Sequence, residues 1–155
     1  MNEANWESAI KNLEIAMRIH RMQPEYNLAM GQCYMELDKL DDAITYFGNV
    51  VRVRPKNING WTELLKCLYK AEMLEDALEY AGFAFEQTDG KPIFLFYKSA
   101  VLYAMGKSKE ALLNLEAGMN RNPKLIKKFI EINPSILQVQ QVVDLIARYK
   151  KRKSL

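Results

Sequence analysis

The sequence predicts an all-α fold made of a pair of antiparallel helices that is repeated along the chain. The first observation is a period of 34 residues, which places Ala43, Ala77 and Ala111 at equivalent positions with no insertion between copies. The second is that apolar residues recur at steps of three and four, as they do on one face of a helix. A fixed period in this range is typical of stacked helical arrays, in which each unit packs on its neighbours.

Composition and length are those of an ordinary soluble chain. The 155 residues, 49% of them apolar and 26% charged, suffice for a single domain over 1–155 with its own core. No run of 18 apolar residues is present, and the polar, acidic first residues do not resemble a signal peptide. Cys33 and Cys67 are too few for a disulfide scaffold, so we expect them to be reduced and buried. These features favour a cytoplasmic protein that does not bind membranes.

The charge of the chain is concentrated at one end. The formal net charge is +3, and residues 148–155 carry five positive charges and no acid, so the rest of the chain has a net charge of −2. A general basic face is absent, which argues against a dedicated nucleic-acid binder. A binder that acts through the basic end is a third hypothesis. It predicts affinity that falls steeply with salt and is lost when residues 148–155 are deleted.

Residues 3–21 are predicted to form an amphipathic helix that corresponds to the second half of a repeat. Ala9 is equivalent to Ala43, and Leu13 is equivalent to Phe47. No first half precedes this helix. If the chain is part of a longer array, its uncapped apolar positions should be partly exposed, or covered by a second copy in a homodimer; these positions are Trp6, Ile10 and Ile15.

Full repeats are predicted over 24–57, 58–91 and 92–125. Pro24 suits the first turn of a helix, Pro55 ends the first unit, and the breakers in 88–92 end the second. Gly106 permits a turn with positive φ between the two helices of the third repeat. The expected helices are 24–37, 40–53, 58–71, 74–87, 92–105 and 108–121.

The segment 126–155 is predicted to be a degenerate half repeat followed by a capping helix and a basic tail. Phe129 falls at the position of Trp61, but Pro134 soon interrupts the pattern. A last helix over 136–152 is then expected to cover the apolar end of the stack, with its polar side exposed to solvent. Its apolar side is expected to contain Val139, Val142, Val143, Ile146 and Tyr149.

The repeated unit resembles the tetratricopeptide repeat (TPR). The resemblance is carried by the skeleton Gly31, Tyr34, Ala43, Phe47 and Pro55, and it covers residues 24–125 in full. It implies a right-handed superhelical solenoid whose concave groove is lined by the first helix of each repeat and holds peptides or partner proteins. The sequence departs from the family pattern where a turn glycine is common, since these positions hold Asp38 and Glu72.

Carried onto this sequence, the resemblance implies a groove with an aromatic row and a basic centre. Met35, Tyr69 and Tyr103 recur at the period of the repeat, and Lys66 and Lys70 would favour an acidic or carboxylate-bearing ligand. In the alternative interpretation the tyrosines pack on the neighbouring repeat and the lysines are solvated. The complete set of candidate groove residues is Leu28, Gln32, Met35, Thr62, Lys66, Tyr69, Lys70, Phe96, Ala100 and Tyr103.

The function predicted from these features is that of a protein–protein interaction scaffold. The alternative is a structural C-terminal fragment that caps a longer TPR protein whose ligand binds upstream. Binding of chaperone C-termini by the family's carboxylate clamp is disfavoured, because the clamp positions hold Leu28, Gln32, Glu63, Ile93 and Tyr97. His20 is the only histidine, and no phosphate-binding glycine motif is present, so we expect neither enzymatic activity nor a cofactor or metal.

Overall fold

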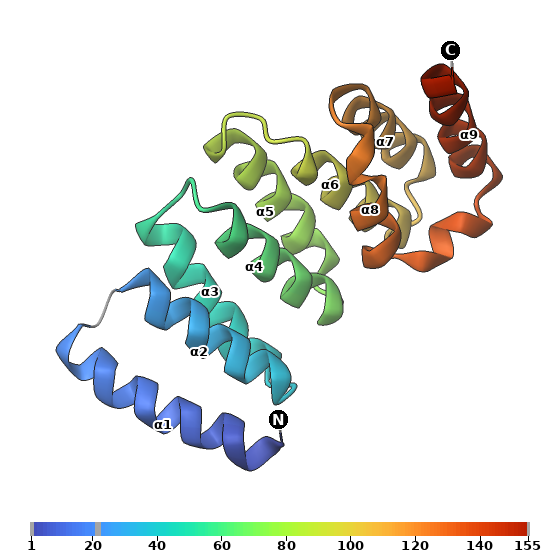
Figure 1. The fold of residues 1–155 in the computed structure, drawn as a ribbon. Helices are drawn as coiled ribbons and strands as arrows, with labels where there is room; N and C mark the ends of the chain where they lie inside the picture. The colour runs from blue at the N-terminus through green and yellow to red at the C-terminus, as the bar shows by residue number, and fades with distance from the viewer. Residues whose placement is uncertain (1, 21–22, 155) are drawn as a thin grey trace. The chain divides into compact units, whose positions relative to one another are not determined.

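The computed structural model describes residues 2–20 and 23–154, and all regular elements in this part of the chain are helical (Figure 1). The chain forms two compact units, Met1–Met73 (unit 1) and Leu74–Leu155 (unit 2), which are described separately. Among the described residues, no helix has the length and apolar character that crossing a membrane requires. The sequence-based division into one domain with three full repeats stays a prediction.

Unit 1 is a row of helices in which each helix packs on the next in the sequence. Contacts join the first to the second, the second to the third, and the third to the fourth. The predicted bounds are correct to within two residues at each described end, because prolines and polar caps mark the helix starts. Residue 21, the expected end of the first helix, lies outside the described residues. The helices are α1 (Glu3–Ile19), α2 (Pro24–Glu36), α3 (Leu40–Val53) and α4 (Ile58–Lys70).

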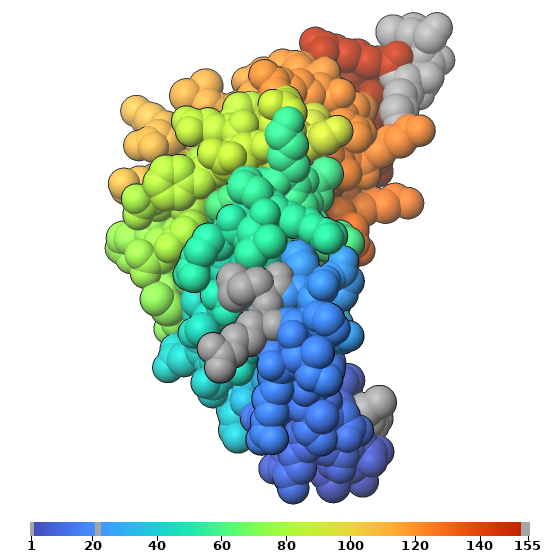
Figure 2. Space-filling model, turned by 90° about the vertical axis from the view of Figure 1, so that its left-hand side faces the viewer, coloured from blue at the N-terminus to red at the C-terminus, as the bar shows by residue number. Residues whose placement is uncertain are grey.

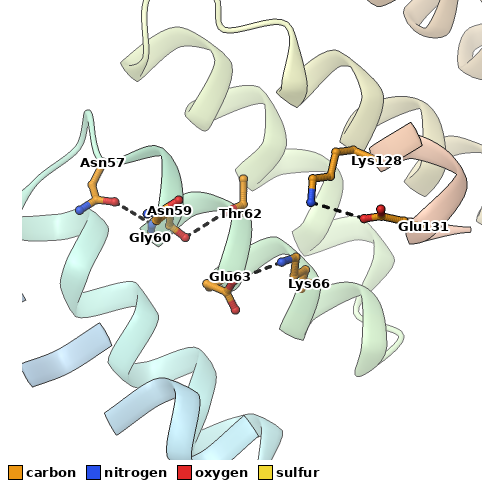
Figure 3. A network of polar contacts seen from close by, with 8 residues as sticks. All are labelled: Asn57, Asn59, Gly60, Thr62, Glu63, Lys66, Lys128 and Glu131. Carbon is orange, nitrogen blue, oxygen red and sulfur yellow. Dashed lines mark hydrogen bonds and ion pairs between the residues drawn. The ribbon is translucent and has the colours of Figure 1, made fainter. Parts of the chain in front are cut away.

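The core of unit 1 depends on close packing between α2 and α3. The Phe47 side chain is completely buried, and a Cβ atom on Gly31 would lie only 2.5 Å from its ring. Glycine at position 31 therefore allows the ring to lie directly against the backbone of α2. Trp61 is buried at the start of α4, where its indole Nε1–H donates a 2.6 Å hydrogen bond to the carbonyl oxygen of Pro55. The side chain of Asn57 caps the same helix by accepting from the backbone N–H of Gly60 at 2.9 Å (Figure 3).

The turns after α2 and α4 have the same left-handed geometry. Asp38 has φ of 57° and Glu72 has φ of 59°, the region that favours glycine. The residue that follows each of them closes the end of the helix with a backbone hydrogen bond. The N–H of Lys39 donates to the carbonyl oxygen of Tyr34, and the N–H of Met73 donates to that of Leu68, both at 2.9 Å. This 6→1 bond is that of a Schellman ending, which normally places glycine at the left-handed position. These two turns therefore carry backbone strain that the repeat geometry imposes.

Replacing Glu72 with glycine is therefore expected to stabilise the protein by about 0.5–1 kcal/mol, because glycine adopts positive φ without the Cβ clash. Urea unfolding followed by circular dichroism measures the change. The control is Glu79→Gly, at an exposed position within a helix of unit 2, which should destabilise by about 1 kcal/mol. The same destabilisation from both substitutions would contradict the assigned strain at Glu72.

Unit 2 is built around one central helix. The helix at Ile93–Ala104 contacts the helices before and after it and also a short helix further along the chain. Ser99 is buried within it and donates a 2.7 Å hydrogen bond to the carbonyl oxygen of Ala111, which joins two neighbouring helices. The elements are α5 (Leu74–Gln87), α6 (Ile93–Ala104), α7 (Ser108–Arg121), η1 (Pro123–Leu125), α8 (Ile126–Ile132), η2 (Pro134–Gln138) and α9 (Gln140–Ser154).

The capping segment differs from its prediction in two respects. The last helix begins at Gln140 and not at 136, because Pro134 starts a separate 3₁₀ turn, η2. Leu145, with 1% of its surface exposed, packs in the core of unit 2 together with Val142, whereas Val143 is exposed. Residues 142, 145, 146 and 149 have the helical spacing of one face, and position 143 lies off that face. The prediction for Val143 is therefore wrong.

Candidate functional site

Unit 1 contains an open hollow of about 620 Å³ between α1, α2 and α4, which we call the unit 1 hollow. Its volume is within the range of small-ligand and peptide sites. Its lining is mainly apolar, with two carboxylates from α2 and α4. The lining residues are Trp6, Ala9, Asn12, Leu13, Ala29, Gln32, Cys33, Met35, Glu36 and Glu63.

The side of the hollow formed by α1 is an apolar face that is only partly covered, since Ala9 and Leu13 pack in part against the cluster of Ile10, Met30 and Cys33. Ala9 and Leu13 are only half-buried. Their equivalents in the next repeat, Ala43 and Phe47, are completely buried, the ring of Phe47 lying against Gly31 of α2. The hollow therefore lies where the repeat pattern would place one more helix, or a segment that takes its place.

The exposure of α1 agrees only in part with what an uncapped helix predicts. Ile15 is 58% exposed and Ile19 is 74% exposed, and the side chains of α1 form the dark blue part of the surface in Figure 2. Trp6 is half-buried, as expected. Ile10 is buried, with only 8% of its surface exposed, because it packs against Met30 and Cys33 of α2. The expectation of exposure is wrong for Ile10.

Two of the predicted groove residues, Gln32 and Met35, lie in the unit 1 hollow. Leu28 and Thr62 are half-buried outside it, and the hydroxyl of Thr62 donates to the carbonyl of Asn59 at 3.1 Å (Figure 3). Tyr69 is half-buried, and burial raises the pKa of its phenol. The structure thus brings part of the predicted set from α2 to one open site.

The two lysines of α4 each have an acidic neighbour. Lys66 Nζ lies 3.2 Å from Glu63 Oε1 (Figure 3), and Lys70 Nζ lies 3.3 Å from Asp38 Oδ1. The basic centre expected from the sequence is therefore partly neutralised within unit 1. Ion pairs between exposed groups contribute only about 0–1 kcal/mol to stability, so exchanging Glu63 or Asp38 for another carboxylate as the partner of the lysine costs little free energy.

The three candidate residues of unit 2 lie on the buried side of α6. Phe96 and Ala100 have no exposed surface and belong to a core cluster with Phe129 of α8. Tyr103 packs against the same cluster, its ring centroid 6.4 Å from that of Phe129. In the structure α8 covers this side of α6, so Phe96 and Ala100 act as core residues and do not line an open surface.

Tyr103 is half-buried as a whole, but its hydroxyl oxygen is buried. The hydroxyl has no hydrogen-bond partner in the described part of the chain, and burial raises the pKa of the phenol. The raised pKa means that the folded state keeps a proton that the unfolded state releases above pH about 10, so this group lowers stability at higher pH. In this structure the side chain of Tyr103 packs against the core of unit 2.

The cysteines are buried and unbonded, as predicted. Burial raises the pKa of the Cys67 thiol to about 11 and also raises the pKa of Cys33. Thiolate is the metal-binding and nucleophilic form, and it is therefore disfavoured at both sites. Among the described residues, no group of three or more histidine, cysteine, aspartate or glutamate side chains is arranged to hold a metal ion.

Sequence reasoning missed most of the residues that line the unit 1 hollow. It assigned the groove to the first helix of each repeat and treated α1 only as an uncapped end. The equivalence of Ala9 and Leu13 to the buried Ala43 and Phe47 could have indicated this hollow, because it predicts an apolar face on α1 with no helix of the same repeat to cover it.

Comparisons with known proteins give the fold. No protein-family model and no curated protein sequence matches the chain. A crystal structure of MamA matches with a TM-score of 0.73 at 15% identity, over 97% of this chain and 90% of that one. MamA from Desulfovibrio magneticus RS-1 matches with a TM-score of 0.70 at 16% identity, over 95% and 82%. A thermophilic TPR protein of Thermus thermophilus matches with a TM-score of 0.62 at 17% identity, over 98% and 92%. The chain therefore has the all-α tetratricopeptide-repeat fold.

Proposed function

We propose that this protein is a non-enzymatic interaction scaffold that binds a segment of a partner protein in the unit 1 hollow. The observation that carries the proposal is the open apolar face of α1, lined by Trp6, Ala9 and Leu13 and continued by Met35 of α2. An apolar surface of this kind gains free energy when a partner covers it, by about 25 cal/mol for each Å² removed from water. The TPR fold supports a protein partner in general.

The chemistry of the hollow favours a ligand with apolar side chains and polar flanks. Trp6 and Met35 supply contact area, and Gln32 offers an amide that can both donate and accept. Two carboxylates, Glu36 and Glu63, line the hollow, and Glu63 pairs with Lys66 just outside it. An acidic residue on the ligand would interact with Lys66 or Lys70. An acidic ligand is also the type that the sequence favours.

The experiment compares two glutamine substitutions of the same kind. Peptides are selected from a random library displayed on phage, with the wild-type protein as bait, and their affinity is measured by fluorescence polarisation. Gln32→Trp fills the hollow and should raise the Kd at least about tenfold. Gln87→Trp, at an exposed position of α5 outside the hollow, should leave it within about twofold. Equal affinity of the two variants would exclude the hollow as the binding site.

The exposed face of α1 favours a second candidate function, in which the hollow receives a helix that extends the helical stack. The helix would come from a second copy of the chain or from a longer array. Ala9 and Leu13, which line the hollow and are only half-buried, support this candidate because an added helix would bury the rest of their apolar surface. Sedimentation equilibrium tests the homodimer: wild type should dimerise as concentration rises, and Gln32→Trp should remain monomeric. A wild-type protein that stays monomeric up to the highest soluble concentration would exclude it.

A further inference from the structure

Unit 2 contains a second open hollow, of about 400 Å³, which we call the basic hollow. It lies between the end of α7, the start of α8 and the last helix, α9. It has no residue in common with the unit 1 hollow, and none of its lining residues was predicted to bind a ligand in the concave groove. The inference below does not depend on the function proposed for unit 1.

The floor of the basic hollow is apolar and is held by the core of unit 2. Met119 is 2% exposed and belongs to the core cluster, while Ile126 and Ile146 are half-buried and pack against it. Tyr149 forms one wall: its hydroxyl donates to the side chain of Asn120, and the guanidinium carbon of Arg152 lies 5.3 Å from the centre of its ring. The floor is thus formed by the core packing of unit 2 before any ligand binds, and Tyr149 contacts α7 beside it.

The rim of the basic hollow carries positive charge. Lys124, Lys127 and Lys150 line it, and no aspartate or glutamate does so among the described residues. The neighbouring lysine in the sequence, Lys128, lies outside the hollow, and its Nζ lies 3.4 Å from Glu131 Oε2 (Figure 3). An apolar floor ringed by three ammonium groups attracts anions while offering no hydrogen bonds at its base.

We propose that the basic hollow binds an acidic peptide segment of a partner protein that carries one large apolar side chain. The apolar side chain would be buried against Met119, Ile126 and Ile146, and flanking carboxylates would approach the lysines. Burial of the anchor supplies most of the affinity, since exposed ion pairs are individually weak. The lysines supply orientation and a faster association rate. A nucleic-acid backbone would use the charges but leave the apolar floor unused.

Three labelled peptides of equal length test the two parts of this site. The first is a run of aspartate and glutamate with a central leucine, the second has serine in place of the leucine, and the third keeps the leucine but has asparagine and glutamine in place of the acids. Fluorescence polarisation with the full-length protein should show that the second and third bind about tenfold or more weakly than the first. Equal binding of the first two would overturn the proposal, because it would indicate general electrostatic adsorption.

Charge-reversal variants locate the binding. Lys124→Glu combined with Lys127→Glu changes two exposed side chains of the rim and should weaken binding of the leucine peptide more than tenfold. Lys107→Glu combined with Lys109→Glu, at exposed positions at the other end of α7, is the matched control and should change it less than about twofold. Circular dichroism checks that both variants are folded.

Equal loss of affinity in both variants would overturn the proposal. Tighter binding of a DNA duplex or an anionic vesicle than of the leucine peptide would overturn it as well. The Gln32→Trp variant should bind the leucine peptide like wild type, which separates this site from the unit 1 hollow.

Discussion

Phe47→Ala is expected to destabilise the protein by about 3–5 kcal/mol, because it removes a completely buried ring from the contact between α2 and α3. The space cannot close easily, since the opposite surface is the backbone of α2 at Gly31. Urea unfolding followed by circular dichroism measures the loss. Phe83→Ala, which removes a ring that is 44% exposed on α5, is the matched control and should cost less than about 1 kcal/mol.

A double-mutant cycle shows whether the ring and the glycine are coupled. Gly31→Ala alone should be strongly destabilising, because its Cβ would lie within 2.5–2.8 Å of three ring atoms of Phe47. In a Phe47→Leu background the same change should cost less, with a coupling energy of about 1 kcal/mol. Strict additivity of the two changes would contradict the close contact between these residues.

Phe129→Ala is the second substitution with a large expected effect, about 3–5 kcal/mol of destabilisation in unit 2. The ring is fully buried, and its centroid lies 6.2 Å from that of Phe96 and 6.4 Å from that of Tyr103. Its loss should also hydrate the Tyr103 hydroxyl and lower the pKa of that phenol towards its ordinary value, since burial is what raises it.

The two effects of Phe129→Ala are measured separately. Urea unfolding gives the stability, again with Phe83→Ala as the exposed control. Ultraviolet absorbance titration gives the pKa of Tyr103, as the difference between each protein and the same protein carrying Tyr103→Phe. An unchanged pKa of Tyr103 together with a full loss of stability would mean that α8 does not control the hydration of this side chain.

The sequence predicts the helices of this fold closely because its strongest signals are local. Pro24 and Asn57 mark helix starts, and the 34-residue period repeats every boundary. The left-handed turns could also be anticipated, since Asp38, Glu72 and Gly106 stand at equivalent positions and all have positive φ. Each of these features depends on residues a few positions apart.

The candidate site was less predictable because it depends on contacts between distant segments. The burial of Phe96 and Ala100 follows from the way α8 packs on α6, a contact between segments that belong to different repeats. The prediction that Val143 is buried is wrong for a different reason. Val142 and Val143 are both apolar, and only the helical spacing from Leu145 indicates that Val142 is the buried one. The unit 1 hollow depends on a helix face left uncovered, which requires knowing what packs on α1.

The cover that α8 places on α6 has a consequence for self-association. Head-to-tail filaments need two different complementary faces on each subunit, both accessible. In the described part of the chain the α1 side of the unit 1 hollow is open, while one side of α6 is covered by Phe129 of α8. The side of α6 that Phe129 covers is therefore not available as a second face, and an association through α1 alone would be a symmetric pair.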